Sequence, residues 1–260
     1  MAMKKRTKGN ITAPSLPGKD MLAEVNNNEA GNIYNSLFAK NRKVEYDNKD
    51  IALVNIRTNP DNQIFRAMDD DEDIRILAED IKRNGLMHNL VVFPEQEEGS
   101  AVYVLLSGER RFRALNYLQE KGDATWNIVN CNVVTTPLTE NEKKVLLYSA
   151  NLQVRGGFSD EAIRRQAIAE FITCLQREPY NMSREEALNA TKIVSTVNPR
   201  TIERDARIEE KLKGKLKTLL NDKFLTRSEC ETYLRFEADK QDEIANRFEK
   251  LQAVDCHSDD

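Results

Sequence analysis

The sequence is poor in the side chains that build metal centres and disulfide frameworks. Its 260 residues include only four cysteines and two histidines. No two cysteines are spaced as a Cys-x-x-Cys pair; they stand at Cys131, Cys174, Cys230 and Cys256. A zinc site is therefore not expected, and the cysteines are interpreted as reduced, mostly core residues of a cytosolic protein.

Long hydrophobic runs are also missing. No apolar stretch approaches the ~20 residues that are needed to span a bilayer, and no signal-peptide core follows the basic start of the chain. We therefore expect a protein that has no membrane segment and works in the cytoplasm.

Neither sign of charge dominates the chain. The 39 lysines and arginines are slightly outnumbered by 43 acidic residues, which gives a net charge of −4. This balance excludes a uniformly basic nucleic-acid binder, but it allows a basic patch on one part of the surface. The length allows one or two domains with a hydrophobic core.

The chain divides into four parts by composition and periodicity. Residues 1–48 are polar and partly basic, and they predict a flexible arm. Short strands and helices alternate over 49–136, as is typical of a small α/β module. Residues 137–225 are predicted to be helical, and 226–260 to form further helices and a polar tail. The expected fold class is α+β, with an α/β module before an all-α domain.

The elements of the α/β module follow from hydrophobic runs and helix caps. A helix is predicted at 73–84, with Ile76, Leu77 and Ile81 buried and Gly85 as a left-handed cap. The acidic run at 69–73 is interpreted as its N-terminal cap, because it lacks the alternating spacing and glycine of a calcium loop. Strands are predicted at 51–56, 90–94, 101–106 and 126–135.

The strand at 101–106 leads into the most informative segment of the chain. Ala114, Leu115 and Leu118 recur at helical spacing, so Ser107 and Gly108 are predicted to form a tight turn between a strand and a helix. Such a turn presents unbonded backbone N–H groups and the positive end of a helix dipole, which favour an anion. Gly108 also lets a ligand approach without a Cβ in the way.

Three arginines follow this turn within four residues, at Arg110, Arg111 and Arg113. Their planar, permanently charged guanidinium groups suit phosphate oxygens, so a phosphate-bearing ligand is one prediction. The alternative is a strand–helix corner with solvated arginines paired to Glu109 and Glu120. The residues alone leave both open, since cations in the first turn of a helix oppose its dipole unless an anion arrives.

The helical part contains a pattern typical of a helix-turn-helix. Thr139–Glu142 has the form of a capping box, and Ser159 is predicted to cap a helix at 160–176. Ser183 with Glu186 forms a second capping box, and Asn198 with Pro199 begins another helix after a four-residue turn. The candidate DNA contacts lie at or after that start: Asn198, Arg200, Thr201, Arg204 and Lys211. The alternative is an ordinary helical hairpin with a charged face.

The segment Gly108–Ala114, with the sequence Gly-Glu-Arg-Arg-Phe-Arg-Ala, resembles the GERRxRA motif of the ParB/Noc family of chromosome and plasmid partition proteins. Upstream, residues 77–86 and 90–93 resemble the family's helix–Gly–strand segment. Downstream, Asn151-Leu152-Gln153 resembles the core of its third motif. The likeness covers roughly residues 50–245.

The resemblance implies a DNA-binding clamp of the cytoplasm and nucleoid whose N-terminal module binds CTP with magnesium. Family members close as homodimers around a palindromic DNA site, and a ParA-type ATPase is a possible partner. By position, Glu109 would serve hydrolysis or its gating, and Asn151 would approach the metal or the phosphates. The implied nucleotide-binding residues are Gly85, Gly108, Glu109, Arg110, Arg111, Arg113 and Asn151.

The sequence departs from the family pattern at several of these places. Ala150 stands where the third motif has Glu, which removes a magnesium contact, and the arginine of that motif is displaced to Arg155. His88 and Asn89 replace a Gln-Pro pair. These changes favour nucleotide binding over turnover and leave a weak CTPase activity open.

Two other classes of function stay open. One is a plain helix-turn-helix regulatory protein whose ParB-like module no longer hydrolyses nucleotide and has become an interaction domain. The other is an enzyme on the same scaffold. Sulfiredoxin-like relatives place a catalytic cysteine where this chain has Glu109, and a nucleotide-dependent kinase is also conceivable. A helix-turn-helix after the module argues against both enzymes.

Overall fold

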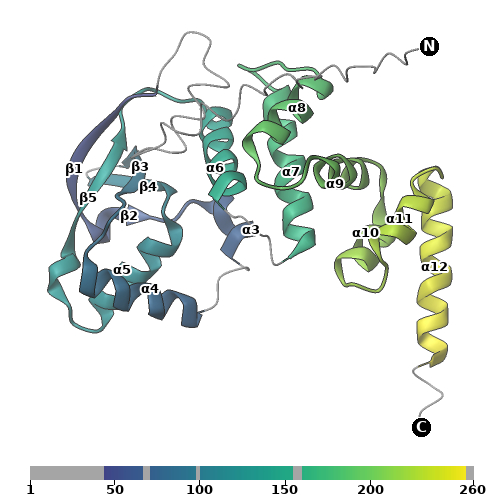
Figure 1. Ribbon diagram of the computed structural model, residues 1–260, viewed down its shortest axis with the longest axis horizontal. Helices are drawn as coiled ribbons and strands as arrows, with labels where there is room; N and C mark the ends of the chain where they lie inside the picture. The colour runs from purple at the N-terminus through teal and green to yellow at the C-terminus, as the bar shows by residue number, and fades with distance from the viewer. Residues whose placement is uncertain (1–43, 67–70, 98–99, 155–159, 256–260) are drawn as a thin grey trace, which may run out of the picture.

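The computed structural model describes residues 44–66, 71–97, 100–154 and 160–255. A five-stranded sheet with helices is followed by a helical region, so the predicted α+β fold class is confirmed. In Figure 1 the sheet lies at one end of the molecule and helix α12 (Ala238–Asp255) at the other. Helix α6 (Glu140–Val154) stands between the sheet and the later helices. Most of the predicted arm, together with Arg155, Ser159 and Cys256, lies outside the described residues.

The sheet is mixed, with strand order β1–β5–β3–β4–β2. β1 pairs antiparallel with β5 and β3 with β4, whereas β3 is parallel to β5 and β2 to β4. Parallel pairs need crossover connections, and helices α4 and α5 lie in those connections. The elements are β1 (Tyr46–Ala52), β2 (Ile56–Arg57), α4 (Asp71–Asn84), β3 (Leu90–Glu97), β4 (Ser100–Ser107), α5 (Glu109–Glu120) and β5 (Ile128–Val134).

The first strand begins earlier than predicted. Instead of a strand at 51–56, β1 ends at Ala52, and the 3-10 turn η1 (Leu53–Asn55) separates it from the short β2. β1 is an edge strand whose residues 47–50 are exposed. An exposed polar strand has no hydrophobic alternation, so the sequence pattern shows only its buried end at Ile51.

Helices α4 and α5 cover one face of the sheet. Ile74, Ala78 and Ile81 of α4 are buried there against sheet residues such as Leu90. The prediction that Ile76 is buried was wrong, because Ile76 is 62% exposed. Ile74 takes the inward position, and a residue two places further along lies about 200° around the helix.

Helix α6 covers the other face, and its central turn is buried on all sides. Val145, Leu146, Leu147 and Tyr148 are four consecutive residues with at most 5% exposure. Consecutive residues are about 100° apart, so these four surround most of the helix. One core cluster joins α6 to the sheet and to the helices that follow. Thr139 N–H donates to Glu142 Oε2 at 2.7 Å, and Glu142 N–H to the Thr139 hydroxyl, which confirms the capping box.

The remaining helices form the second half of the molecule. Ser183 and Glu186 form a complete capping box, and Asn198 caps the helix that begins at Pro199, as predicted. Asp160 caps the earlier helix by accepting from two backbone N–H groups, one residue after the predicted cap. The helices are α7 (Glu161–Gln176), α8 (Arg184–Val194), α9 (Pro199–Lys211), α10 (Gly214–Asn221), α11 (Arg227–Tyr233) and α12.

Three of the four cysteines are buried and free, as predicted: Cys131, Cys174 and Cys230. Burial raises the pKa of each thiol to about 11. They therefore stay protonated at neutral pH and act as small core residues. Over the described part of the chain, no helix has the length and apolar character needed to cross a membrane.

Buried ion pairs join α7 to α9. Arg164 Nε donates to Asp205 Oδ2 at 2.7 Å, and the Asp205 side chain is fully buried. Arg165, which is 1% exposed, donates to Asn221 Oδ1 at 2.6 Å and lies 3.5 Å from Glu209. Arg227, the first residue of α11, lies 3.5 Å from the other Asp205 oxygen. These contacts fix α9 against its neighbours.

The buried pair predicts a large stability effect. Asp205→Ala leaves the Arg164 guanidinium buried beside an empty position, so we expect the free energy of unfolding to fall by about 3–5 kcal/mol. Urea denaturation followed by circular dichroism measures it. Glu243→Ala removes a carboxylate from an exposed ion pair on α12, so the urea concentration at which half of the protein is unfolded should not change. If Asp205→Ala and Glu243→Ala unfold at the same urea concentration, the buried pair has no structural role.

Candidate functional site

The turn between β4 and α5 requires glycine for two reasons. Gly108 has a φ of +104°, a conformation that residues with a Cβ rarely adopt. A Cβ there would lie 2.8 Å from Leu90 Cδ2 and 3.2 Å from Arg111 Nη2. Gly108 is also the N-cap of α5, and no side chain caps this helix. The first backbone N–H groups of α5 therefore have no side-chain acceptor at the cap position.

Arg111 folds back over this turn and holds the loop that precedes β3. Its Nη1 donates to the carbonyl oxygens of His88 at 2.5 Å and of Asn89 at 2.9 Å. The Asn89 side chain in turn donates to Asn130 Oδ1 of β5 at 2.8 Å. The structure thus brings the His88-Asn89 pair against the Gly108 turn and fixes the Arg111 guanidinium there.

Arg110 and Arg113 point to a different side of α5. Arg113 Nη2 lies 3.0 Å from Asp71 Oδ1, and Arg110 Nη2 lies 3.7 Å from Asp73 Oδ2. Arg111 is two residues before Arg113 and so lies about 200° away around the helix. The acidic residues in the first turn of α4 therefore stabilise the N-terminus of α4 through its helix dipole. They also supply carboxylate partners for two of the three arginines.

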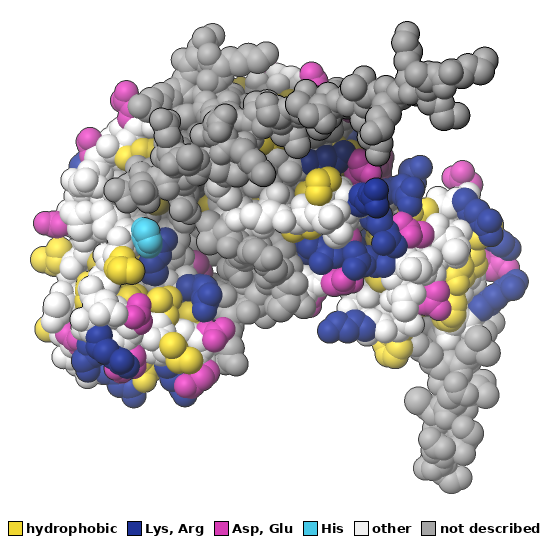
Figure 2. All heavy atoms as spheres, viewed as in Figure 1, with side chains coloured by type: hydrophobic (Ala, Val, Ile, Leu, Met, Phe, Trp, Pro, Cys, Tyr) yellow, Lys and Arg dark blue, Asp and Glu magenta, His cyan; other side chains and the backbone are white. Residues whose placement is uncertain are grey.

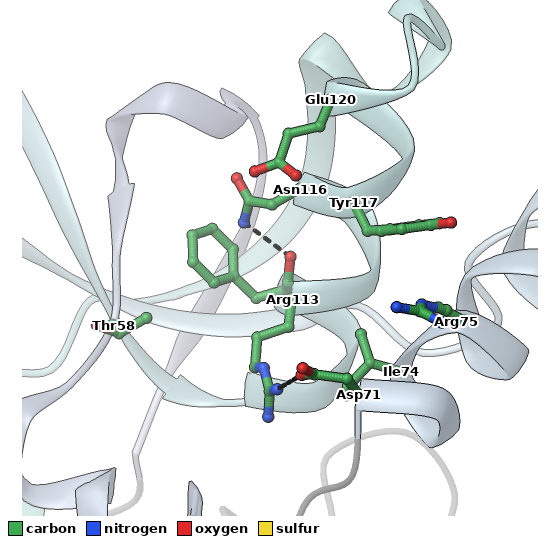
Figure 3. Close-up of a pocket in the computed structure, with 9 residues that line it drawn as sticks. Thr58, Asp71, Ile74, Arg75, Arg113, Asn116, Tyr117 and Glu120 are labelled. Carbon is green, nitrogen blue, oxygen red and sulfur yellow. Dashed lines mark hydrogen bonds and ion pairs between the residues drawn. The ribbon is translucent and has the colours of Figure 1, made fainter.

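A hollow of about 480 Å³ lies between α4, α5 and the end of β2. Figure 3 shows the Arg113–Asp71 ion pair at one side of it and Glu120 at the other. Its walls carry both signs of charge and two aromatic rings. The lining residues are Thr58, Asp71, Ile74, Arg75, Phe112, Arg113, Asn116, Tyr117 and Glu120. Arg111, on the opposite side of α5, is not among the described lining residues.

The remaining predicted nucleotide residues are placed as follows. Gly85 ends α4 with φ +80°, and its N–H donates to Ile81 O at 2.8 Å, which confirms the left-handed cap. Glu109 is only 6% exposed at the start of α5. Asn151 lies on α6, where its Nδ2 donates to Leu147 O at 2.9 Å and to Asn62 Oδ1 at 3.4 Å.

The contact of Asn151 joins α6 to a turn in the first half of the chain. Asn62 is buried in the 3-10 turn η2 (Pro60–Asn62), which is followed by the short helix α3 (Gln63–Arg66). Lys144, also on α6, forms an ion pair with Asp61 of η2 at 3.1 Å. Two polar contacts therefore fix the η2 turn to α6.

The candidate site offers few side-chain ligands for a magnesium ion. Magnesium in proteins is usually bound through one or two carboxylates together with phosphates of a substrate. Ala150, where the third motif has Glu, is 7% exposed, and Asn151 offers an amide oxygen as the nearest alternative. Across the described ranges, no group of three His, Cys, Asp or Glu side chains could hold a metal ion.

A basic stripe runs along one side of α9. We use this name for Arg200, Arg204, Arg207 and Lys211, which recur at intervals of four, three and four residues and so share one face of the helix. In Figure 2, Lys and Arg side chains gather over the region of α9 and α10. Arg207 was missed by the sequence analysis, although its spacing from Arg204 was a signal that could have found it.

The side chains of the predicted DNA contacts differ in their exposure and in their hydrogen bonds within the protein. Asn198 Oδ1 accepts from the Arg200 N–H at 2.9 Å, so it is committed to capping α9. Arg200 and Lys211 are exposed, and Thr201 is half-buried. Arg204 is held by Glu231 of α11 through two hydrogen bonds of 2.9 and 2.7 Å.

Comparison with known proteins gives one family and several similar structures. Residues 37–142 match the family described as the ParB N-terminal domain. No curated protein matches the chain. A C-terminally truncated chromosome-partitioning protein ParB from Caulobacter crescentus, complexed with CTP-γ-S, is 19% identical. The match covers 98% of that protein and 77% of this chain, with a TM-score of 0.33.

Two structures of pNOB8-like ParB N-domains are also similar. One is 11% identical, with a TM-score of 0.44 and coverage of 79% of this chain and 98% of its own. The other is 12% identical, with a TM-score of 0.41 and coverage of 82% and 91%. The family match includes the sheet, α4, α5 and the Gly108 turn. Residues 37–142, which make up less than half of the chain, are therefore similar to a ParB N-terminal domain.

Proposed function

We propose that this protein is a DNA-binding partition protein whose α/β module binds CTP. The observation that carries the proposal is the turn at Gly108, where an α5 terminus without a side-chain cap meets a guanidinium already held in place. Backbone N–H groups and a helix dipole favour an anion at such a terminus. The similar Caulobacter crescentus ParB was crystallised with a CTP analogue, and the motif resemblance points to the same nucleotide.

Arg111 is oriented for a phosphate before any ligand arrives. Because Nη1 is held by the carbonyls of His88 and Asn89, the guanidinium keeps its position beside Gly108. A cation fixed in this way loses little side-chain entropy when an anion binds. Arg110 and Arg113 form ion pairs with Asp73 and Asp71, so a triphosphate has to compete with these exposed carboxylates for the two arginines.

We infer nucleotide binding rather than turnover. Glu109 is buried, and Ala150 supplies no carboxylate for a magnesium ion. A triphosphate brings its own oxygen ligands for the metal, to which the Asn151 amide could add one. The role of this chain is thus to hold the phosphates with the α5 terminus and the arginines.

The helical half is proposed to bind DNA through the basic stripe. The proposal is supported by the position of Arg200 and Thr201 at the start of α9, because the start of a recognition helix is the part that meets base edges and phosphates. The stripe gives an acidic protein one locally basic surface. In keeping with the family, we infer a homodimer on a palindromic site, a ParA-type ATPase as partner and association with the nucleoid.

A second candidate is a plain helix-turn-helix DNA-binding protein whose α/β module serves only as an interaction domain. The ion pairs of Arg110 and Arg113 with α4 and the buried Ala150 favour it. In that case DNA binding is unchanged by nucleotide, and the module binds none.

Nucleotide titration separates the two candidates. We expect calorimetry with CTP, ATP and GTP in magnesium to show binding of CTP. Arg111→Ala should weaken it about tenfold or more, because a hydrogen bond to a charged group contributes roughly 1.5–3 kcal/mol. Arg110→Ala should weaken it less, since this guanidinium is exposed and less firmly held.

Arg247→Ala is the matched control for that titration. Arg247 is an exposed arginine of α12, at the opposite end of the molecule from the sheet (Figure 1), so its removal changes the net charge equally but far from the Gly108 turn. Its affinity should equal that of the wild type. A folded wild-type protein that binds no nucleotide would leave the plain DNA-binding candidate.

The basic stripe is tested by the salt dependence of DNA binding. Fluorescence anisotropy would use a duplex that the wild-type protein enriches from a randomised pool. If Arg200 and Lys211 each contact a phosphate, Arg200→Ala and Lys211→Ala should each lower the slope of log affinity against log salt by about 1. Lys82→Ala, an exposed lysine on α4, should not change the slope. Identical slopes in all variants would exclude the stripe from the interface.

A further inference from the structure

Glu231 on α11 contacts the middle of the basic stripe. Its two carboxylate oxygens accept from Arg204 Nε at 2.9 Å and Nη2 at 2.7 Å, and Oε1 also accepts from Arg207 Nη2 at 2.9 Å. The hydrogen bond from Arg204 is the main cause that lowers the pKa of Glu231, and the same bond raises the pKa of Arg204. Arg204 and Glu231 therefore both remain charged at neutral pH and form a stable ion pair.

The two hydrogen bonds occupy one edge of the Arg204 guanidinium. The bonds use the Nε–Nη2 edge, and no hydrogen bond or ion pair of Nη1 is found within the described residues. The Arg204 side chain is 41% exposed and that of Glu231 only 24%. The carboxylate is thus the less exposed of the two groups, and the Nη1–Nη2 edge of the guanidinium has no partner among the described residues and remains for a ligand. A bidentate pair of this kind also restricts a long, flexible side chain to one geometry.

We propose that Glu231 is a positioning residue for DNA recognition, which holds Arg204 so that its Nη1–Nη2 edge can meet a guanine. The inference rests on the proposed DNA-binding function of α9. Bidentate contact of arginine with guanine O6 and N7 is the commonest base-specific contact in the major groove, and it demands a fixed fork. Arg207, held by the same carboxylate, stands one turn further along the stripe, where it suits a phosphate.

Glu231 is not needed to attach α11 to α9. The buried Asp205 of α9 already lies between Arg164 of α7 and Arg227 of α11. The pairs of Glu231 are partly exposed, and exposed pairs contribute little to stability. A carboxylate near DNA phosphates also lowers non-specific affinity. The hydrogen bonds of Glu231 are therefore better explained as orienting the two arginines than as attaching α11 to α9.

The test compares specific and non-specific DNA. Glu231→Ala should weaken binding to the duplex that the wild-type chain enriches from a randomised pool by about tenfold, because the oriented guanine contact is lost. Binding to a duplex of unrelated sequence should be equal or tighter, since two arginines become available to phosphates. The ratio of the two affinities is thus expected to fall.

Glu243→Ala is the matched control. Glu243 likewise accepts from two cations, Lys240 and Arg247, but within α12. Its removal changes the net charge by the same amount and should leave the affinity ratio unchanged. Glu231→Gln keeps the length of the side chain and one oxygen acceptor, so it should lose less specificity than Glu231→Ala. It also provides the comparison if Glu231→Ala fails to fold, which circular dichroism would show.

A double mutant shows whether Glu231 acts through Arg204. In an Arg204→Ala background, Glu231→Ala should cause no further loss of specific binding, because the residue that it orients is already gone. Independent losses that add would overturn the inference, and so would a Glu231→Ala variant that binds the enriched duplex as tightly as the wild type. A wild-type chain that enriches no duplex would instead overturn the proposed DNA-binding function.

Discussion

The burial of the central turn of α6 on every side, at residues 145–148, is the constraint on which the arrangement of both halves depends. Phe93, Val104 and Leu106 of the sheet and Ile168 and Phe171 of α7 belong to one core cluster with α6. A helix with an apolar stripe needs one partner surface, but a helix that is apolar all round needs two. The α/β module and the helical region are therefore not independent bodies joined by a linker, because each covers a face of the same helix.

The polar contacts of α6 make this connection specific. On the side of the module, Lys144 and Asn151 bind Asp61 and Asn62 of the η2 turn. Towards α7, Asn141 Nδ2 donates to the carbonyl oxygens of Cys174 and Glu178 at 2.9 and 2.7 Å. These partly buried polar groups need particular partners, so they favour one packing among the many that apolar contacts alone would allow. The residue that resembles a nucleotide ligand, Asn151, thus stands on the element that also positions α7.

The sequence was most informative where a local physical rule determines the structure. Ser183 and Asn198 were identified as caps because their side chains can satisfy backbone N–H groups within the same few residues. The turn at Gly108 was identified because a hydrophobic strand pattern precedes it and apolar residues at helical spacing follow it. Rules that depend on distant partners were less useful. Ile76 was placed in the core although Ile74 occupies the inward position, and the exposed part of β1 has no hydrophobic pattern to reveal it.

The arginines show why a motif alone does not define a site. Arg110, Arg111 and Arg113 are close in sequence, but helix geometry sends Arg111 to one side of α5 and its two neighbours to the other. The acceptors of Arg111 are backbone carbonyls, which every residue has, so no sequence pattern could identify them. The same holds for Glu231, which lies 27 residues from Arg204 and becomes its partner only because α11 packs beside α9. The motif specifies which charges are present, whereas the fold decides which of them are held ready for a ligand.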